Sequence, residues 1–452
     1  NHSKGRSPEV WIYNPDTEEH RAHPDGDYVP NKAVAALQRD LRTIPMFMAK
    51  RDDVVLVDAA PCPHYLNDLF DLGFTIPEFV VADLARPRLP KSHELAERTV
   101  ARLQPWGWSP RIETFLSPLS PQNEPSPGVP PANASSQHSK AWFAERYAQL
   151  TAKLPFAEFC ATDPAPRALT TYDDVLAHAQ TLFESGFPMV VLKAPWGASG
   201  RRNIRLLPHE PNERQSVWMK KILTTQGALV VEGLFDKVAD LSLQFEVTEN
   251  GDFRSHGLTR PMTDALGRFR GMVVTRPLKD LEPTTRDFAF QATGDAKWLN
   301  RTLGHVGQEI ACELASHGYR GPVGLDAMLV RHEGTLKLRP LVEVNVRFTM
   351  GRIGLALAGR VAPGRSSVWC MLGERDIRAA GHTHFQDALN ALQAALPTEL
   401  QDGKPPRIRQ GAVATNVPTT AKQVLTILLV GDSKAEIESA LNAAGFPGVF
   451  PL

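Results

Sequence analysis

The chain has 452 residues, and its 50 lysines and arginines balance 50 aspartates and glutamates, so the formal net charge is zero. A nucleic-acid-binding protein would usually carry a basic excess, and no apolar run approaches the roughly 20 residues of a membrane span. We therefore expect no nucleic-acid partner and no membrane span in a chain of about three domains.

The four cysteines are scattered without a C-x-x-C pair, which argues against a zinc site and against a disulfide framework. No secretory signal is recognisable at the start of the sequence. The default expectation is a reducing, cytoplasmic location.

Residues 1–116 are expected to form an N-terminal domain, because predicted strands and helices alternate from residue 9 onward, as in a small parallel α/β layer. The expected strands cover 10–13, 54–57 and 79–82, and the expected helices cover 31–42, 63–72 and 93–103.

The composition changes abruptly at residue 117, after which six prolines occur among Ser, Asn and Gly up to residue 136. Such a composition indicates a linker or long surface loop with little regular structure, which we assign to residues 117–138. A proline-rich recognition motif is the sharper alternative, and a plain spacer is favoured over it.

A short apolar strand beginning near Pro188 delivers Lys193, and a loop with Gly197, Ser199 and Gly200 follows. Small-residue loops let backbone N–H groups approach phosphate oxygens closely. The spacing fits neither G-x-x-x-x-G-K-[ST] nor G-x-G-x-x-G. An ordinary turn after a strand remains the alternative on this segment alone.

Residues 341–347 alternate between apolar and functional polar side chains. In a strand, Glu343, Asn345 and Arg347 would share one face while the intervening valines enter a core. A carboxylate, a carboxamide and a guanidinium in one row suit hard cations and phosphate oxygens. An amphipathic strand with a salt-bridged surface is the alternative.

A preceding strand is expected over 323–330. If the turn between the two strands centres on residues 334–335, Asp326 falls directly opposite Glu343. Like charges so placed repel each other, and they need a cation between them or a raised pKa. Magnesium, which prefers oxygen ligands, is the natural occupant. Pro340 leaves the register open, because proline in a strand implies an edge or a bulge.

The C-terminal part reads as an α+β extension. After a helical segment over 353–361, helices are expected over 385–396 and 434–444, and strands over 410–417 and 424–431.

Taken in order, these segments resemble the ATP-grasp superfamily of ligases. The matching segments are Ser139-Lys140 opening a helix, Val191–Arg201, Val230–Leu234, Gly324–Asp326 and Glu343–Arg347. The resemblance implies an α/β and α+β multidomain protein with an ATP-grasp fold. Its parts would be a Rossmann-like domain over 1–116, an ATP-grasp N-terminal part with a lid over 139–235, a metal-binding part over 236–375, and the extension over 376–452.

The resemblance also implies residue roles. Lys140 and Lys193 would contact the nucleotide phosphates together with Ser199 and Gly200, and the backbone of Glu232, Gly233 and Leu234 would read the adenine edge. Asp326, Glu343 and Asn345 would hold two Mg²⁺ ions, which Mn²⁺ could replace. Arg347 would stabilise charge on the transferred phosphoryl group, with Lys193 as the second catalytic cation. The loop has fewer glycines than the richest family versions and carries Arg201-Arg202 instead.

Substrate contacts are less well marked. Arg260, Arg276 and Arg352 are candidates, because arginine forks bind carboxylates in bidentate fashion. Exposed arginines with surface ion pairs are the alternative for each.

The resemblance favours an ATP- and Mg²⁺-dependent ligase that joins a carboxylate of the amino-acid or peptide class to an amine. The reaction would pass through an acyl phosphate and release ADP and phosphate. The alternatives are a small-metabolite phosphotransferase of the same fold and a catalytically inactive nucleotide-binding regulatory protein. The expected partners are small-molecule substrates, and a homo-oligomer is left open.

Overall fold

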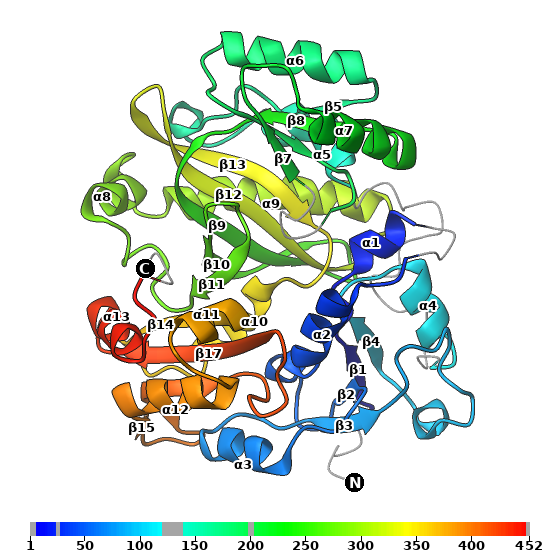
Figure 1. Ribbon diagram of the computed structural model, residues 1–452, viewed down its shortest axis with the longest axis vertical. Coiled ribbons are helices and arrows are strands. Elements are labelled where there is room, and N and C mark those ends of the chain that lie inside the picture. The colour runs from blue at the N-terminus through cyan, green and yellow to red at the C-terminus, as the bar shows by residue number, and fades with distance from the viewer. Residues whose placement is uncertain (1–5, 24–27, 120–138, 198–202, 449–452) are drawn as a thin grey trace.

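The N-terminal region folds around a parallel sheet, as predicted. The computed structural model describes residues 6–23, 28–119, 139–197 and 203–448, and the first sheet has the strand order β3-β2-β1-β4 (Figure 1). Its strands are β1 (Glu9–Ile12), β2 (Val54–Val57), β3 (Glu78–Val81) and β4 (Arg102–Pro105). Its helices are α1 (Thr17–Arg21), α2 (Lys32–Asp40), α3 (Pro63–Asp71) and α4 (Pro110–Leu116).

The prediction of a helix over 93–103 is wrong. The helical part is a 3-10 turn at Glu94–Glu97, and β4 begins at Arg102 and pairs in parallel with β1. Leu95, Val100 and Leu103 enter the same core as the sheet. The open edge of β1 offers backbone partners along its whole length, and this long-range pairing outweighs the local helical spacing.

A second sheet, β5-β8-β6-β7, is antiparallel and covered by two helices at the top of Figure 1. Its strands are β5 (Arg167–Leu169), β6 (Val190–Lys193), β7 (Asn203–Leu206) and β8 (Leu229–Gly233), and its helices are α6 (Tyr172–Glu184) and α7 (Glu213–Gln226). This unit, called the lid below, has its own small core.

The third sheet has nine strands in the order β13-β12-β9-β10-β11-β14-β17-β16-β15. They are β9 (Asp236–Val247), β10 (Phe253–Thr263), β11 (Phe269–Val273), β12 (Gly321–His332), β13 (Thr335–Asn345), β14 (Ser366–Gly373), β15 (Glu399–Gln401), β16 (Arg407–Ala414) and β17 (Val424–Gly431). Its helices are α5 (Lys140–Leu150), α8 (Pro283–Gln291), α9 (Trp298–Ser316), α10 (Met350–Ala358), α11 (Glu374–Ala379), α12 (Phe385–Ala395) and α13 (Lys434–Ala443). The long helix α9 packs its apolar stripe against β9, β10 and β13.

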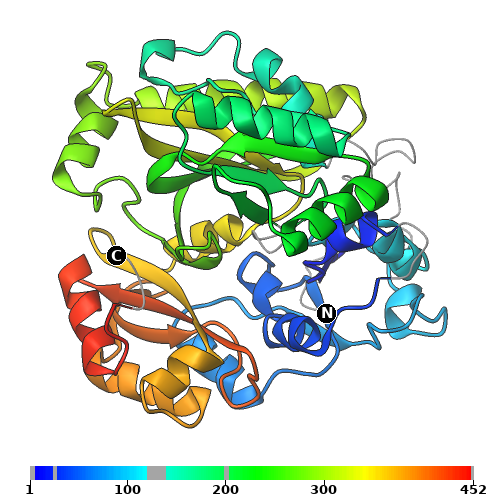
Figure 2. The same ribbon diagram turned by 45° about the horizontal axis from the view of Figure 1, so that its top comes forward.

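The two C-terminal helices and β17 form within one residue of their expected bounds, whereas the strand expected over 410–417 covers Arg407–Ala414. Both strands continue the nine-stranded sheet. Strand β14 pairs with β11 on one side and with β17 on the other, so the sheet crosses residue 375 without a break. The C-terminal region also lies beside the N-terminal domain in Figures 1 and 2, where Asp40 accepts backbone hydrogen bonds from residues 422–424. Among the described helices, none is both long and apolar enough to cross a membrane.

Candidate active site

The hairpin β12–β13 brings the two predicted acidic residues together. Asp326 pairs directly with Glu343, which confirms the predicted register at this position. The turn, however, centres on Glu333 and Gly334, one residue earlier than predicted, since His332 pairs with Thr335. A β-bulge compensates for the displaced turn. Between the pairs Asp326–Glu343 and Met328–Arg339, one residue of β12 lies opposite three residues of β13.

Pro340 lies within that irregularity, on the edge strand of the sheet. Proline lacks the N–H that a regular ladder needs, so it favours an edge position and a bulge. The same residue that left the register open therefore explains how a displaced turn still gives the predicted pair.

The two carboxylates differ in their electrostatics. Burial and the neighbouring Glu343 raise the pKa of Asp326 to about 7. Burial alone would raise the pKa of Glu343 as well, but Lys140 and Lys193 outweigh it and hold that pKa below its ordinary value. A shared proton at neutral pH therefore belongs to Asp326.

The two predicted lysines reach the same pocket from different elements. Ser139 caps α5 by accepting a hydrogen bond from the backbone of Trp142, and this fixes Lys140 in the first turn. Its Nζ lies 3.1 Å from Glu343 Oε1 and also donates to the carbonyl of Gly197.

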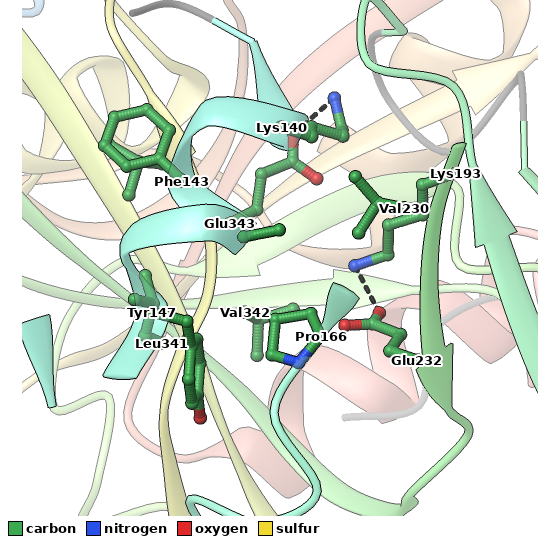
Figure 3. A pocket seen from close by; sticks show the side chains of 12 residues that line it. Lys140, Phe143, Tyr147, Pro166, Lys193, Val230, Glu232, Leu341, Val342 and Glu343 are labelled. Carbon is green, nitrogen blue, oxygen red and sulfur yellow. Dashed lines mark ion pairs between the residues drawn. The ribbon is translucent and has the colours of Figure 1, made fainter. Parts of the chain in front are cut away.

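Lys193 ends strand β6 and is only 7% exposed. Its ammonium group forms an ion pair with Glu232 of β8 (Figure 3). Burial alone would lower the pKa of Lys193, but Glu232 and Glu343 outweigh it and keep that pKa above its ordinary value. Lys193 therefore carries its charge at neutral pH.

The pocket lies between the lid and the nine-stranded sheet. In Figure 3 its charged side chains lie at the top and right, and Phe143, Tyr147 and Leu341 lie on the left. Its lining residues are Lys140, Phe143, Ala144, Tyr147, Pro166, Lys193, Val230, Glu232, Leu341, Val342, Glu343 and Val344. A concave, mostly apolar pocket with a few convergent charges is the usual form of a small-molecule site.

The three predicted hinge residues are placed differently from one another. Glu232 lines the pocket, Gly233 packs closely against the ring of Phe187, and the N–H of Leu234 donates to the carbonyl of Met189 at 2.9 Å. The backbone donor of Leu234 is therefore already used within the lid.

Arg347 follows β13 and joins this group. Its Nη2 lies 3.1 Å from Asn345 Oδ1, and Asn345 in turn donates to Asp326 at 2.9 Å. Its Nε forms an ion pair with Glu18 of α1, and both side chains are 12% exposed.

Glu18 was not found from the sequence. The available signal was its position after β1, at the carboxyl end of a parallel strand, where open α/β sheets bind ligands. Ser242 of β9 was also missed; its hydroxyl donates to Asp326 Oδ1 at 2.7 Å.

The structure does not bring Arg260 and Arg276 to this group. Thr259 pairs with Ser242 and shares the face of Asp326, so the neighbouring Arg260 points to the opposite face, where it contacts the carbonyl of Asp280. Arg276 is exposed and contacts the carbonyl of Gly364.

The third candidate, Arg352, lies on α10, and its guanidinium carbon is 5.9 Å from the centre of the Phe348 ring. Burial lowers the pKa of Arg352, and the charge of Glu246 partly offsets this. Its role as a substrate contact stays a prediction. Ser199 and Gly200 lie outside the described residues, as does most of the proline-rich segment.

The side chains of Asp326, Glu343 and Asn345 suit a hard divalent cation. No cluster of three or more His, Cys, Asp or Glu suited to a metal occurs among the described residues. The donors here are instead two carboxylates and the carboxamide of Asn345, an all-oxygen set of the kind that Mg²⁺ prefers. A cation between Asp326 and Glu343 would also remove the repulsion that adds to burial in raising the pKa of Asp326.

Comparisons with known proteins give a partial sequence match and similar solved structures. No family model matches the chain. Its sequence is similar to the butirosin acyl-carrier protein–L-glutamate ligase of Niallia circulans, with 27% identity over 177 residues, which are 38% of this chain and 36% of that relative. The match thus spans about a third of the relative's length.

Two solved structures are similar over nearly the whole chain. Phosphoribosylamine–glycine ligase of Thermotoga maritima has a TM-score of 0.50 and 14% identity, covering 97% of this chain and 96% of that one. N5-carboxyaminoimidazole synthetase of Staphylococcus aureus, in complex with ADP, has a TM-score of 0.49 and 12% identity, covering 97% and 96%.

Proposed function

We propose that this chain, which has the ATP-grasp fold, is an ATP- and Mg²⁺-dependent ligase that joins a carboxylate to an amine. One observation carries the proposal. Lys140 and Lys193 converge with Glu343 in a pocket between the lid and the nine-stranded sheet, and Asp326 lies directly opposite Glu343. A pocket with two lysines, one of them buried, next to a pair of facing carboxylates suits a polyphosphate and its cations.

The proposed chemistry has two steps. A carboxylate oxygen of the substrate attacks the γ-phosphorus of ATP, the bond to the β-phosphate oxygen breaks, and ADP leaves. The amine nitrogen of the second substrate then attacks the carbonyl carbon of the acyl phosphate, phosphate leaves, and the nitrogen loses a proton. Two anions meet in the first step, so fixed positive charge must surround them.

The residues of the pocket divide these tasks. We assign Lys193 and Lys140 to the phosphates, because both are held in place by carboxylates on rigid elements. The apolar walls, with Tyr147 and Leu341 among them, would hold the adenine ring. Arg347 would stabilise charge on the transferred phosphoryl group, from the position that its contact with Asn345 gives it.

Asp326, Glu343 and Asn345 would hold the Mg²⁺ ions. Bound there, Mg²⁺ would supply positive charge that neutralises the polyphosphate. The lid would exclude water from the acyl phosphate, which water would otherwise destroy.

The favoured carboxylate class is the amino acids and short peptides. The relative from Niallia circulans is by its name a ligase of L-glutamate, so L-glutamate is the first carboxylate to test. Its partner by name is an acyl-carrier protein, and the matched segment covers 36% of its length. The nucleophile of this chain is therefore to be found by experiment, with amines tested first.

The test is release of ADP and phosphate from Mg-ATP in the presence of mixed amino acids, with mass spectrometry of the products. Lys193→Ala is the inactive control, and Lys220→Ala on the outer lid helix is the matched surface control. ADP release together with a condensed product is the expected result.

A phosphorylated product without condensation would replace the ligase by a phosphotransferase. Tight ATP binding without turnover for any carboxylate and amine in a broad panel would favour the regulatory alternative.

A further inference from the structure

Asp326 accepts a hydrogen bond on each carboxylate oxygen. Asn345 donates to Oδ2 at 2.9 Å, and Ser242 donates to Oδ1 at 2.7 Å. Asn345 already has a place in the proposed cation site, whereas Ser242 has none. Ser242 lies on β9 directly opposite Asp326 and is 3% exposed, so a second strand sets the orientation of this carboxylate.

Ser242 is the end of a longer chain of hydrogen bonds. Gln244, two residues along the same face of β9 and fully buried, donates from Nε2 to Ser242 Oγ at 2.8 Å. Its Oε1 accepts from the hydroxyl of Thr349 at 2.7 Å. Thr349 is the N-cap of α10 and accepts from the backbone N–H of Gly351 at 3.2 Å.

The directions of these hydrogen bonds are fixed from Asp326. A carboxylate can only accept, so Ser242 gives its single hydroxyl proton to Asp326 and its oxygen accepts from the NH₂ group of Gln244. The carboxamide oxygen of Gln244 then faces Thr349, whose hydroxyl must be the donor in that contact. The Thr349 oxygen accepts from the backbone N–H of Gly351 at the same time.

Two glycines allow the close packing around this chain. A Cβ on Gly351 would lie 2.4 Å from Gln244 Nε2, and a Cβ on Gly324 would lie 2.7 Å from the methyl group of Thr349. The backbones at Gly351 and Gly324 therefore pack directly against Gln244 and Thr349, which limits the alternative rotamers of these two side chains.

We infer that Ser242, oriented by Gln244 and Thr349, is the positioning residue that holds the Asp326 carboxylate in place for the divalent cation. The inference rests on the proposed function, which assigns Asp326 to the cation site. Partners that orient metal ligands typically account for 10–100-fold in metal affinity or activity. Helix α10 is thereby connected to the cation site through side chains that touch neither cation nor nucleotide.

The test measures Mn²⁺ binding to the full chain by electron paramagnetic resonance at a fixed concentration of ADP. Ser242→Ala is expected to weaken Mn²⁺ binding by roughly 10–100-fold, with native near-UV circular dichroism. Thr259→Val is the matched control. It removes a buried hydroxyl from the neighbouring strand that donates to the backbone carbonyl of Ser242, and it should leave Mn²⁺ affinity near the wild-type value.

Variants of Thr349 test the hydrogen bonds that orient Ser242. Thr349→Val removes the proton that orients Gln244, so it should weaken Mn²⁺ binding although it lies one residue beyond the direct contacts of Ser242. Thr349→Ser keeps the hydroxyl and should restore wild-type binding, which a purely structural role of the threonine methyl would not do.

The Asp326→Asn variant distinguishes failure of the positioning role of Ser242 from failure of the proposed cation site. If Asp326→Asn loses Mn²⁺ binding while folded Ser242→Ala binds like the wild type, the positioning role is overturned and the cation site stands. If Asp326→Asn itself binds Mn²⁺ like the wild type, the cation assignment of the proposed function is wrong, and the positioning role falls with it.

Discussion

At the residue scale, the facing pair Asp326 and Glu343 dominates the site. Two carboxylates in a cross-strand pair cannot both be ionised cheaply, and the nearby lysines favour the ionised form of Glu343. Burial, together with this repulsion, raises the pKa of Asp326 to about 7, within the range of ordinary buffers.

This raised pKa has a consequence for stability without metal. The ordinary pKa of an aspartate is 3.8, so between about pH 4 and pH 7 the folded state binds a proton that the unfolded state has lost, and the free energy of unfolding falls as pH rises. Asp326→Asn removes the effect. In EDTA, its stability relative to the wild type should grow over this window, by as much as about 4 kcal/mol at about 1.4 kcal/mol per pKa unit.

Urea denaturation of both proteins at a series of pH values checks this. A difference between them that stays constant from about pH 4 to pH 8 would contradict the raised pKa of Asp326. Added Mg²⁺ and ADP should reverse the sign of the difference above pH 7, because the wild-type carboxylate then has a cation as its partner.

The sequence made the Asp326–Glu343 pair predictable because both residues belong to one hairpin, in which alternation and a turn define the register. The contact between Arg347 and Glu18 was not predictable in this way. The two residues are 329 positions apart, and nothing local marks a glutamate in a short helix as the partner of a distant arginine.

At the element scale, Arg339 of β13 connects the β12–β13 hairpin to the segment that enters the lid. This arginine is 1% exposed, and its guanidinium lies over the rings of Tyr147 and Phe235. It donates to the carbonyls of Ala161, Thr162 and Pro164, in the segment that leads to β5.

Arg339→Met should therefore leave three carbonyls without their charged donor. Hydrogen bonds to charged groups contribute about 1.5–3 kcal/mol each, so we expect the free energy of unfolding to drop by about 3 kcal/mol or more, with weaker ATP binding. Arg331→Met, at an exposed position of the adjoining strand β12, should change neither quantity. Urea denaturation and nucleotide titration measure both, and equal behaviour of the two variants would exclude this role of Arg339.

Two helical glycines give a second test at this scale. In α10, a Cβ on Gly354 would lie 2.1 Å from the sulfur of Met272 on β11, whereas a Cβ on Gly304 of α9 meets nothing within 4 Å. Gly354→Ala should lose about 1–3 kcal/mol through overpacking. Gly304→Ala should gain up to about 1 kcal/mol from helix propensity. Thermal melts of both variants measure these changes in stability. If Gly354→Ala were as stable as the wild type, α10 would not pack this closely against β11.

Most elements were predictable from local pattern, and the failures share a cause. The hairpin strands, α5 with its Ser139 cap, and β17 carry their own periodicity or capping signals. Strand β4 does not, because it exists through pairing with β1, which lies about 90 residues earlier.

At the scale of the whole molecule, the continuous nine-stranded sheet connects the C-terminal region to the β12–β13 hairpin. Strand β17 is buried along its whole length and pairs with all eight residues of β14. The sequence predicted the strands and helices of this region but not the continuity of the sheet, because strand order depends on contacts between distant segments.

Removal of residues 376–452 should consequently not release an intact core. It would expose the edge of β14 together with Val368, Trp369 and Leu372, which belong to the apolar core, and open apolar edges promote aggregation. We expect the shortened chain to elute as aggregate in size-exclusion chromatography. A monomeric shortened chain that binds ADP and melts cooperatively would show that the extension folds independently.

The irregular pairing at Pro340 also separates the outer end of the β12–β13 hairpin from its inner, acidic end. Changes at the tip, Glu333 and Gly334, need not be transmitted to Asp326 and Glu343, because the bulge can absorb a shift in register. His332 beside the tip stacks on Phe187 of the lid. A fluorophore attached at the tip would therefore act as an optical reporter of lid movement, placed where it leaves the chemistry undisturbed.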